Sequence, residues 1–419
     1  AFMKLTLPFT IHHDEVEYLK VTWVFSKQFV TNTILISLDA GGFYESNPLL
    51  PWISQGSFHL LEHMLFQPTS TVDYVKKFHQ AGATYNAFTS QLNTIYYSHF
   101  TDPDPEILLN MMRMVFDQRT FTSEKVNKEK DIIVNEILSL EDDPLFKTYE
   151  IWHRFLFKRC PVWKNPIGNR SSINKITPAQ LKNIHQLYYH PKQSRLMIVT
   201  NREQNFWMPA LKQFFSLGIP HQNSRVDLVL PEETTTSKRP YRKKNYYPYS
   251  IPFFVAGCKP IGQRFTMLDK IMMDMMTQTV FNSFSTILDE FVFKGYVDDS
   301  YEVDVQCEKE FGYWALSGYS DYPFQMAELI LKEIRKRIAS GLTKEEFSIM
   351  KTHFLTNCLM QANDSMEMPF LLNHLHQFGL SNWEEYYQII ESISWQSIQE
   401  SLPRFMPESQ FRTLIMLPE

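Results

Sequence analysis

Hydrophobic positions in the first hundred residues alternate between strand-like and helix-like spacing. The run Thr33–Leu38 is rich in β-branched residues and predicts a strand. Apolar residues then recur at helical spacing from about Ser57 and again over Thr69–Gln80. Alternation over Thr84–Phe100 predicts two strands joined by a turn near Gln91. The pattern therefore opens with a strand, two helices and a pair of strands.

Helical spacing dominates the next hundred residues. It predicts helices over Pro105–Phe116 and over Ser123–Leu140, with Ser123 as a side-chain N-cap. A further capped helix is expected over Thr177–Leu187. The strand predicted over Arg195–Thr200 would complete the same sheet.

The composition changes between residues 224 and 250, where Pro, Glu and Thr give way to Lys and Arg, so this stretch is the best linker candidate. Beyond it the element order repeats in outline. The expected elements are a strand Pro252–Cys258, a long helix Gly262–Phe293, strands Tyr301–Gln306 and Tyr313–Ser320, and helices from Pro323 onward.

The repeat predicts an α+β protein of two structurally similar α/β-sandwich domains, each a mixed, mainly antiparallel sheet covered by helices. Residues 1–223 would form an N-terminal domain, residues 224–250 a linker, and residues 251–419 a similar second domain. The length of 419 residues agrees with two domains at roughly 100–200 residues each.

Composition excludes several classes of function. Hydrophobic residues make up 44% of the chain, yet no run approaches the ~20 apolar residues of a membrane helix. The net charge of −5 gives no reason to expect nucleic acid as a partner. The four cysteines lie far apart, which favours reduced packing residues over a disulfide framework. The first residues lack a secretory signal pattern, so we expect a cytoplasmic protein.

The segment from His59 to His63 has the pattern HxxEH. On a helix His59 and His63 lie on one face, where both imidazoles can reach a single ion. Glu62 points to the same side and suits the role of general base toward a metal-bound water. Catalytic zinc takes three protein ligands and keeps one open position. A third ligand is therefore needed.

A second helix offers carboxylates for that position. Glu129 and Glu136 are seven residues apart, two turns along one helical face. We favour Glu136 as the third ligand and Glu129 as an accessory acid that orients a neighbouring ligand. Glu141 is the alternative third ligand.

Simpler interpretations exist for each of these residues. Two histidines on a helix can form an ordinary polar face, and Glu129 can be a solvated helix residue. The other histidines examined have no acidic partner at ligand spacing; they are His12, His13, His79, His99, His353, His374 and His376. Motifs of competing chemistries, such as GxSxG or a Gly-rich phosphate loop, do not occur in the sequence.

Several blocks together resemble the pitrilysin or insulinase family of zinc peptidases, and specifically its short subunits related to mitochondrial processing peptidase. The block GSFHLLEHMLF resembles the zinc helix of that family, and EKDIIVNEI resembles the segment that carries its third ligand. The other similar blocks are AGATYNAFTSQLNTIYY, YYHPKQSRLMIVT and GLTKEEFSIMKTHFLTNCLMQANDS. These blocks in order are far more specific than HxxEH alone.

The resemblance implies one zinc per chain held by His59, His63 and Glu136, with Glu62 as base and Glu129 as accessory acid. It also implies that Asn86 and Ala87 lie on an exposed sheet edge, where a peptide substrate adds as a strand. Asn86 could instead be an ordinary turn residue. In the implied reaction Glu62 activates zinc-bound water for attack on a peptide bond.

One stretch departs from the family pattern RxxGLxY, whose Arg and Tyr grip the substrate. With Gly295 as anchor, Val292 replaces the Arg and Asp298 replaces the Tyr. We therefore expect a heterodimer, in preference to a homodimer, with a homologous partner that supplies both groups. Tyr296 or Tyr301 could substitute for the missing Tyr.

Two hypotheses for function follow from these observations. The chain is expected to be a zinc endopeptidase subunit, of bacterial origin, that cleaves peptides or leader segments. The alternative is a non-catalytic scaffold or binding subunit of the same fold. A purely structural zinc site is less favoured, because such sites are usually closed by four ligands and rich in cysteine.

Overall fold

A computed structural model describes residues 7–218, 226–233, 241–245, 249–281 and 285–418. The chain forms two compact units that are each discontinuous in sequence. The first comprises Ala1–Ser139, Lys164–Leu230 and Met360–His374, and the second comprises Leu140–Trp163, Pro231–Leu359 and Leu375–Glu419.

The first unit is built on a six-stranded sheet of described residues in the order β1-β2-β6-β3-β5-β4. Its strands are β1 (Thr10–Val16), β2 (Leu19–Phe25), β3 (Asn32–Leu38), β4 (Thr84–Thr89), β5 (Thr94–Phe100) and β6 (Ser194–Thr200). β2 and β6 run parallel, and every other neighbouring pair is antiparallel. β3 and β6 are buried along most of their length, which places the core of the unit at the centre of this sheet.

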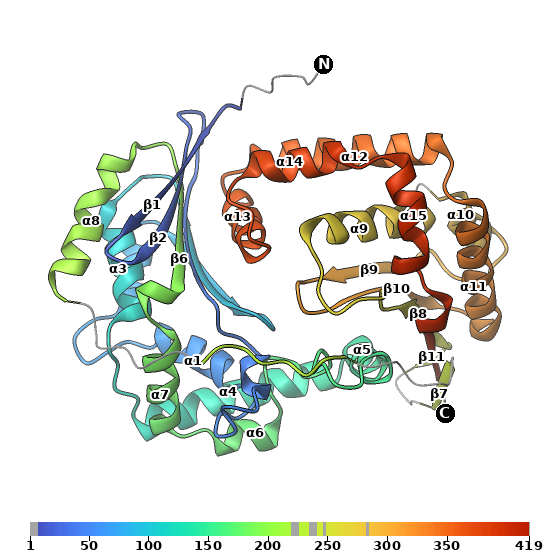
Figure 1. Cartoon of the computed structure of the whole chain (residues 1–419). Helices are drawn as coiled ribbons and strands as arrows, with labels where there is room; N and C mark the ends of the chain where they lie inside the picture. The colour runs from blue at the N-terminus through green and yellow to red at the C-terminus, as the bar shows by residue number, and fades with distance from the viewer. Residues whose placement is uncertain (1–6, 219–225, 234–240, 246–248, 282–284, 419) are drawn as a thin grey trace. The chain divides into compact units, whose positions relative to one another are not determined.

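Helices connect and cover this sheet. They are α1 (Ser57–Phe66), α2 (Tyr74–Gln80), α3 (Pro105–Phe116), α4 (Ser123–Glu141), α6 (Arg170–Lys175), α7 (Pro178–Tyr188) and α8 (Gln204–Ser216), with short 3-10 turns η1 (Tyr44–Ser46) and η2 (Pro191–Gln193). Nine of the twelve residues of α3 are buried, so this helix is part of the core. Figure 1 shows α3 and α8 packed side by side along one face of the sheet.

The second unit has a five-stranded sheet of described residues in the order β7-β11-β8-β10-β9. Its strands are β7 (Tyr241–Asn245), β8 (Phe253–Cys258), β9 (Glu302–Cys307), β10 (Gly312–Tyr319) and β11 (Phe411–Leu417). Its helices are α5 (Pro144–Leu156), α9 (Met267–Phe281), α10 (Thr286–Phe293), α11 (Pro323–Ser340), α12 (Lys344–Ala362), α14 (Trp383–Ser392) and α15 (Trp395–Phe405), with the turn η3 (Glu408–Gln410). The last residues of α12 and the first seven of α13 (Met368–Gln377) belong to the first unit.

The two sheets have the same connectivity. β2 in the first unit and β7 in the second pair in parallel with the last strand of their sheet, β6 or β11, and the remaining pairs are antiparallel. The first sheet differs by the added edge strand β1. The prediction of two similar α/β sandwiches with mixed, mainly antiparallel sheets is confirmed.

Two predicted helices were wrong in extent. The helix expected over Thr69–Gln80 begins only at Tyr74, because Asp73 caps it and Thr69 forms a separate turn with Val72. The helix expected over Gly262–Phe293 is two helices, α9 and α10, because Ser285 has extended backbone angles. Ser competes with helical hydrogen bonding through its side chain, and the Ser285 hydroxyl donates to the Val280 carbonyl at 2.6 Å.

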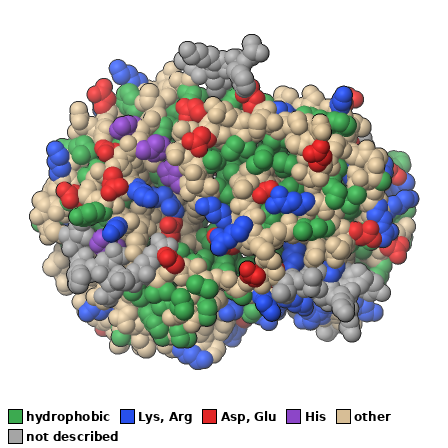
Figure 2. All heavy atoms as spheres, viewed as in Figure 1, with side chains coloured by type: hydrophobic (Ala, Val, Ile, Leu, Met, Phe, Trp, Pro, Cys, Tyr) green, Lys and Arg blue, Asp and Glu red, His purple; other side chains and the backbone are tan. Residues whose placement is uncertain are grey.

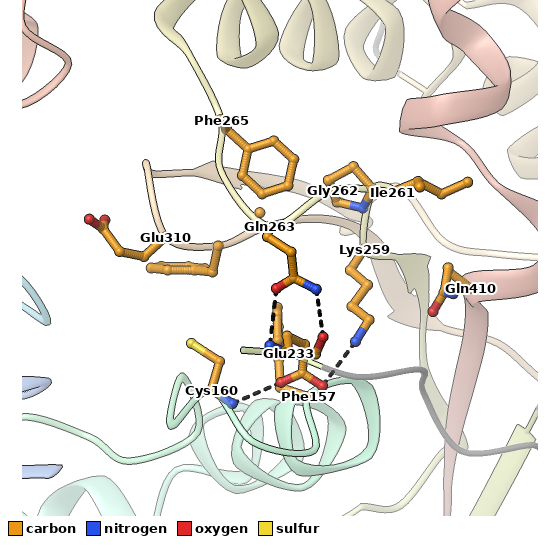
Figure 3. Close-up of a pocket in the computed structure, with 13 residues that line it drawn as sticks. Phe157, Cys160, Glu233, Lys259, Ile261, Gly262, Gln263, Phe265, Glu310 and Gln410 are labelled. Carbon is orange, nitrogen blue, oxygen red and sulfur yellow. Dashed lines mark hydrogen bonds and ion pairs between the residues drawn. The ribbon is translucent and has the colours of Figure 1, made fainter. Parts of the chain in front are cut away.

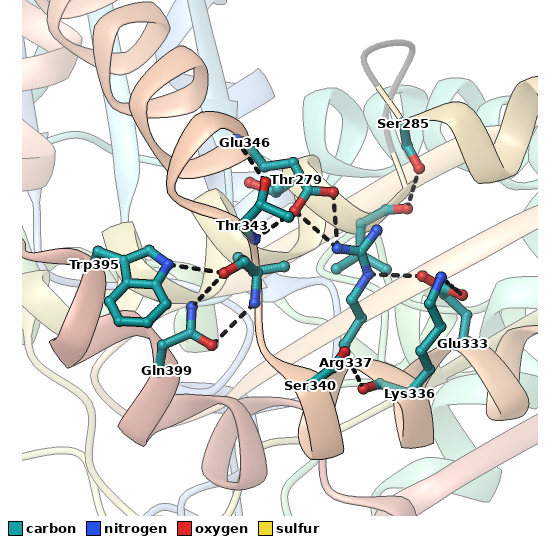
Figure 4. A network of polar contacts seen from close by, with 12 residues as sticks. Thr279, Ser285, Glu333, Lys336, Arg337, Ser340, Thr343, Glu346, Trp395 and Gln399 are labelled. Atoms are coloured by element: carbon teal, nitrogen blue, oxygen red, sulfur yellow. Dashed lines mark hydrogen bonds and ion pairs between the residues drawn. The ribbon is translucent and has the colours of Figure 1, made fainter.

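A buried ion-pair network joins α11 to α12 in the second unit (Figure 4). The Arg337 side chain donates to Glu333 at 2.7 Å and to both oxygens of Glu346 at 2.8 and 2.9 Å. At the turn between the helices, the Trp395 indole N–H donates to the Leu342 carbonyl at 2.8 Å. Each of these charged groups has a partner of opposite charge, so the network links α11 and α12 without leaving a buried charge unpaired.

Surface and composition agree with a mixed-charge protein. On the face shown in Figure 2, side chains of Lys and Arg are interspersed with those of Asp and Glu. All four cysteines are buried and free. Among the described helices, none has the length and apolar character needed to cross a bilayer. The expected linker at 224–250 lies partly outside the described residues.

Candidate metal centre

The helix that carries HxxEH starts at a position that requires glycine. Gly56 has φ of 88°, and a Cβ there would lie 2.4 Å from Ile173 Cδ1. The buried Glu45 carboxylate accepts the N–H groups of Gly56 at 2.8 Å and Phe58 at 3.0 Å. Burial raises the pKa of Glu45 to about 8, although these backbone N–H groups oppose the rise. Glu45 thus replaces the usual N-cap side chain and fixes the start of α1.

Three donor groups meet between α1 and α4. The ligand atoms of His59, His63 and Glu136 all lie within 4.8 Å of one another. Nε2 of His59 is 3.9 Å from one Glu136 oxygen, and Nε2 of His63 is 3.8 Å from the other. Donors bound at about 2.0–2.2 Å to tetrahedral zinc are roughly 3.3 Å apart, so the three groups would move inward to bind this metal. Glu141 is not part of this group of described residues.

Glu129 lies behind His63, on the same face of α4 as Glu136. Its Oε2 is 3.3 Å from His63 Nδ1, and its Oε1 accepts the Gln67 side-chain amide at 2.5 Å. Only 3% of Glu129 is exposed. A carboxylate that accepts the Nδ1 proton of a histidine leaves Nε2 free to bind metal. The structure thus places Glu129 where it can orient His63.

The two histidines differ in the hydrogen bonding of their Nδ1 atoms. Burial and the neighbouring His63 lower the pKa of His59 to about 3, which keeps its imidazole neutral. A neutral imidazole is the form that binds metal. Nδ1 of His59 is buried and has no hydrogen-bond partner among the described residues, whereas Nδ1 of His63 faces Glu129. The donor set fits zinc, with His63 the better supported histidine.

Glu62 is buried beside this group. The Thr89 hydroxyl donates to Glu62 Oε2 at 2.6 Å. Burial raises the pKa of Glu62 to about 7, the Thr89 hydrogen bond and His63 oppose the rise, and Glu136 adds to it. A group with a pKa near neutrality is well matched to taking up and returning a proton. A bound dication would lower this pKa.

Asn86 and Ala87 lie on β4, the last strand of the first sheet. Among the described strands β4 pairs only with β5. Asn86 is exposed, and its side-chain oxygen accepts the Ala87 N–H at 2.9 Å. An edge strand presents unpaired backbone groups to an added strand. Asn86 lies within the strand and not at a turn.

The second unit contains the stretch that departs from the family pattern. Val292 lies near the end of α10 and Gly295 follows with φ of 68°. Asp298 is exposed and accepts the Ser300 hydroxyl at 2.6 Å. The cation of this stretch, Lys294, pairs with Glu290. The expectation of a partner that supplies the Arg stays a prediction.

A separate cavity of about 250 Å³ lies in the second unit (Figure 3). Glu233 accepts the backbone N–H groups of Lys158, Arg159 and Cys160 at 2.8–2.9 Å and pairs with Lys259 at 3.0 Å. The principal charges at this cavity therefore neutralise each other, which is typical of a structural anchor.

Three residues of the site were missed in the sequence. Thr89 ends the strand block AGATYNAFT that had been recognised, and its alternation with Ala87 was a usable signal. Gln67 stands four residues after His63, one helical turn away, which was a weaker signal. Glu45 gave none, because its contact with α1 crosses an irregular segment.

Comparison with known proteins points to one family. Residues 26–156 match the family model described as insulinase (peptidase family M16), and this range includes both α1 and α4. The chain is 22% identical over 425 residues to "uncharacterized zinc protease YmfH" of Bacillus subtilis, covering 98% of this chain and 97% of that protein. It is 27% identical over 162 residues to the "probable mitochondrial-processing peptidase subunit beta" of Arabidopsis thaliana, covering 38% of this chain and 30% of that protein.

Solved structures agree on the fold. A putative M16-like peptidase from Alicyclobacillus acidocaldarius matches with a TM-score of 0.90 at 20% identity, over 100% of both chains. A structure titled "peptidase M16 inactive domain" from Pseudomonas fluorescens matches with a TM-score of 0.83 at 13% identity, over 98% of both chains. Together, the family model over residues 26–156, the relatives and the shared fold confirm the resemblance of this chain to the insulinase family, peptidase family M16.

Proposed function

We propose that this chain is a zinc-dependent endopeptidase subunit that hydrolyses peptides or leader segments. The observation that carries the proposal is the meeting of His59, His63 and Glu136 within 4.8 Å, beside the buried base candidate Glu62. The names of relatives, which include zinc proteases, support the same activity.

In this proposal His59, His63 and Glu136 hold one zinc per chain. Zinc bound there would polarise the substrate carbonyl and lower the pKa of a water. Glu62 accepts a proton from the attacking water and returns it to the leaving amine. Thr89 holds one oxygen of Glu62, so the other oxygen is the one available for proton transfer. Glu129 acts as an accessory acid that orients His63.

Substrate would bind as an added strand along the open edge of β4, at Asn86 and Ala87. In that position the Ala87 N–H exchanges its Asn86 side-chain acceptor for a substrate carbonyl. Backbone hydrogen bonds of this kind give affinity without selecting a particular sequence. The edge therefore favours flexible peptide segments over folded proteins.

A homologous partner subunit would supply the substrate-gripping Arg and Tyr that Val292 and Asp298 replace here. A heterodimer is favoured, and the relative named as a processing peptidase subunit beta is compatible with it. We expect native mass spectrometry of the complex from its source to show a second chain of similar mass. A fully active assembly of this chain alone would contradict the heterodimer. The proposed location is the bacterial cytoplasm.

The alternative is a non-catalytic scaffold subunit of the same fold. It is favoured by one observation, the close fold match to a structure titled an inactive domain. A scaffold has no physical need for three donors and a buried base in one place, so we place it second.

The first test is cleavage of unstructured fluorogenic peptides by the full-length chain, alone and in its native complex, with zinc added and then removed by a chelator. We expect Glu62→Gln to lower the cleavage rate by about 10²–10⁴-fold, the usual contribution of a general base, while zinc stays bound. Glu345→Gln, at an exposed position on α12, is the matched control. If the native complex binds zinc but neither it nor the lone chain cleaves any peptide, the scaffold alternative is correct.

A further inference from the structure

The candidate donors come from two helices, so the position of α4 against α1 decides whether they meet. α1 carries His59 and His63, and α4 carries Glu136. A metal site tolerates displacements of only about 0.5 Å. The contacts that hold the end of α1 to α4 therefore matter for the zinc that the proposed function requires.

Gln67 forms the first of these contacts. It is the C-cap of α1, one turn after His63. Its side-chain amide donates to Glu129 Oε1 at 2.5 Å, and Glu129 Oε2 lies 3.3 Å from His63 Nδ1. Both oxygens of a buried carboxylate are thus engaged, one by Gln67 and one by the histidine.

Two cations bind the backbone at the end of α1, at Gln67 and Pro68, which we call the α1 corner. Arg119 donates to the Gln67 carbonyl at 3.1 Å, with its guanidinium 5.3 Å from the centre of the Tyr74 ring. Lys125, one turn before Glu129 on α4, donates to the Pro68 carbonyl at 2.6 Å. Helix α4 therefore holds this corner twice, once through a backbone carbonyl and once through Glu129.

The residues that make these polar contacts border a cavity. Gln67, Pro68, Tyr74, Arg119 and Lys125 all line one cavity of about 780 Å³. On the side that faces this cavity these residues have no close-packed neighbours, so the hydrogen bonds described above help to hold them in place. Glu129 is buried next to this cavity's Gln67, and the Gln67 amide and His63 are the hydrogen-bond partners of its two oxygens.

We propose that Gln67 is a positioning residue of the zinc centre. Its amide fixes Glu129 so that Glu129 accepts the N–H of His63 Nδ1. That choice of tautomer leaves His63 Nε2 with its lone pair, 3.8 Å from Glu136 Oε1, as the donor toward the metal. Without the amide, one oxygen of a buried carboxylate loses its partner and the geometry behind His63 loosens.

The test uses Gln67→Met, which keeps the length of the side chain and removes the donor. Gln118→Met is the matched control, because Gln118 lines the same cavity and is exposed. Zinc affinity is measured by chelator competition on the full-length chain. We expect Gln67→Met to weaken zinc binding by about 10–100-fold, the usual range for partners behind a ligand. Gln118→Met should change the affinity by less than about twofold.

A second measurement does not depend on metal. In the zinc-free protein, ¹⁵N resonances of His63 should show one tautomer, with the proton on Nδ1, and a mixture in Gln67→Met. Gln67→Lys restores a donor of similar reach and should recover both the single tautomer and most of the affinity; it also serves if Gln67→Met fails to fold.

Unchanged zinc affinity and an unchanged tautomer in Gln67→Met would overturn the role of Gln67 and leave the proposed function intact. If the wild-type chain binds no zinc, the proposed function fails instead. The tautomer in the zinc-free protein then decides on Gln67 by itself.

Discussion

The two units share a strand connectivity but differ in the helix that follows the central strand of each sheet. In the first unit β3 leads to α1, which carries two histidines and a glutamate toward α4. In the second unit β8 leads to α9, whose Met272, Met273, Met275 and Met276 are all buried. One helix presents donor groups and the other fills a core. The shared fold therefore determines where a site can form. The side chains of the helix at that position determine whether the site can bind a metal.

The two halves of the chain are also similar in the segments that follow helices α4 and α12. In each half a 19-residue helix, α4 or α12, is followed by a segment that packs with the other unit. Residues 140–163 belong to the second unit, and residues 360–374 belong to the first. Phe370 of the latter stacks on Phe88 of β4, with ring centres 6.3 Å apart. The strand edge proposed to bind substrate is thus supported by a segment from the late part of the chain.

The largest expected difference between the units is in metal binding. We expect His63→Ala to weaken zinc binding by more than about 100-fold, because even partners behind a ligand contribute about 10–100-fold. His353→Ala on α12, the counterpart of α4, should leave the affinity unchanged. Isothermal titration of both variants with zinc measures this. Equal losses would mean that the donors are not confined to the first unit.

The next difference is in stability. Met276 is fully buried in α9, so Met276→Ala should lower the free energy of unfolding by about 2–5 kcal/mol. Zinc affinity should stay at the wild-type value, since the change lies in the second unit. Denaturant unfolding followed by chelator competition tests both parts. A large loss of zinc affinity would show that the core of α9 and the metal site are coupled.

The smallest difference is in pH dependence, and it has opposite sign in the two units. Burial alone would raise the pKa of Glu233, but three backbone N–H groups and Lys259 outweigh it and hold the pKa below the ordinary value of 4.5. Its stabilisation is therefore present above pH 4.5 and lost as the pH falls further. For Glu45, burial outweighs the backbone N–H groups and the charge of Lys164 and raises the pKa to about 8. Its contribution is present below pH 4.5 and lost as the pH rises toward 8.

Comparison of the wild type with Glu233→Gln and Glu45→Gln should show these two trends. At pH 7 we expect Glu233→Gln to cost about 1.5–3 kcal/mol, the range for hydrogen bonds to a charged group. Free energies of unfolding measured from about pH 2.5 to pH 8 cover both windows. For each variant, the difference in unfolding free energy from the wild type is plotted against pH. Slopes of the same sign for the two variants would contradict the opposite pH dependence of Glu233 and Glu45.

Local patterns predicted the fold well where they were regular. The alternation of Thr84–Phe100 and the β-branched run at Thr33 both correspond to observed strands. The hairpin of β1 and β2 was missed because its turn consists of Glu17 and Tyr18 at positive φ, with no Gly, Asn or Asp to mark it. The assignment of residues 140–163 to the second unit and of residues 360–374 to the first could not be predicted. It depends on contacts between residues far apart in the sequence, which no local pattern reveals.

The candidate site divides in the same way. HxxEH and the spacing of Glu129 and Glu136 are local patterns on helices, so they could be identified before the structure was known. Gln67 and Thr89 could not be assigned their roles, because each acts through a contact with a residue 62 or 27 positions away. The sequence thus predicts donors, and the fold determines which groups orient them.

The central claim is that the first unit holds zinc and the second does not. Metal analysis of the purified full-length chain, with the double variant His59→Ala and His63→Ala alongside, tests it most directly. The account predicts one zinc per wild-type chain and none in the double variant, with both proteins folded. Zinc-free wild-type protein that stays so after incubation with zinc, or a double variant that still holds one zinc, would contradict it.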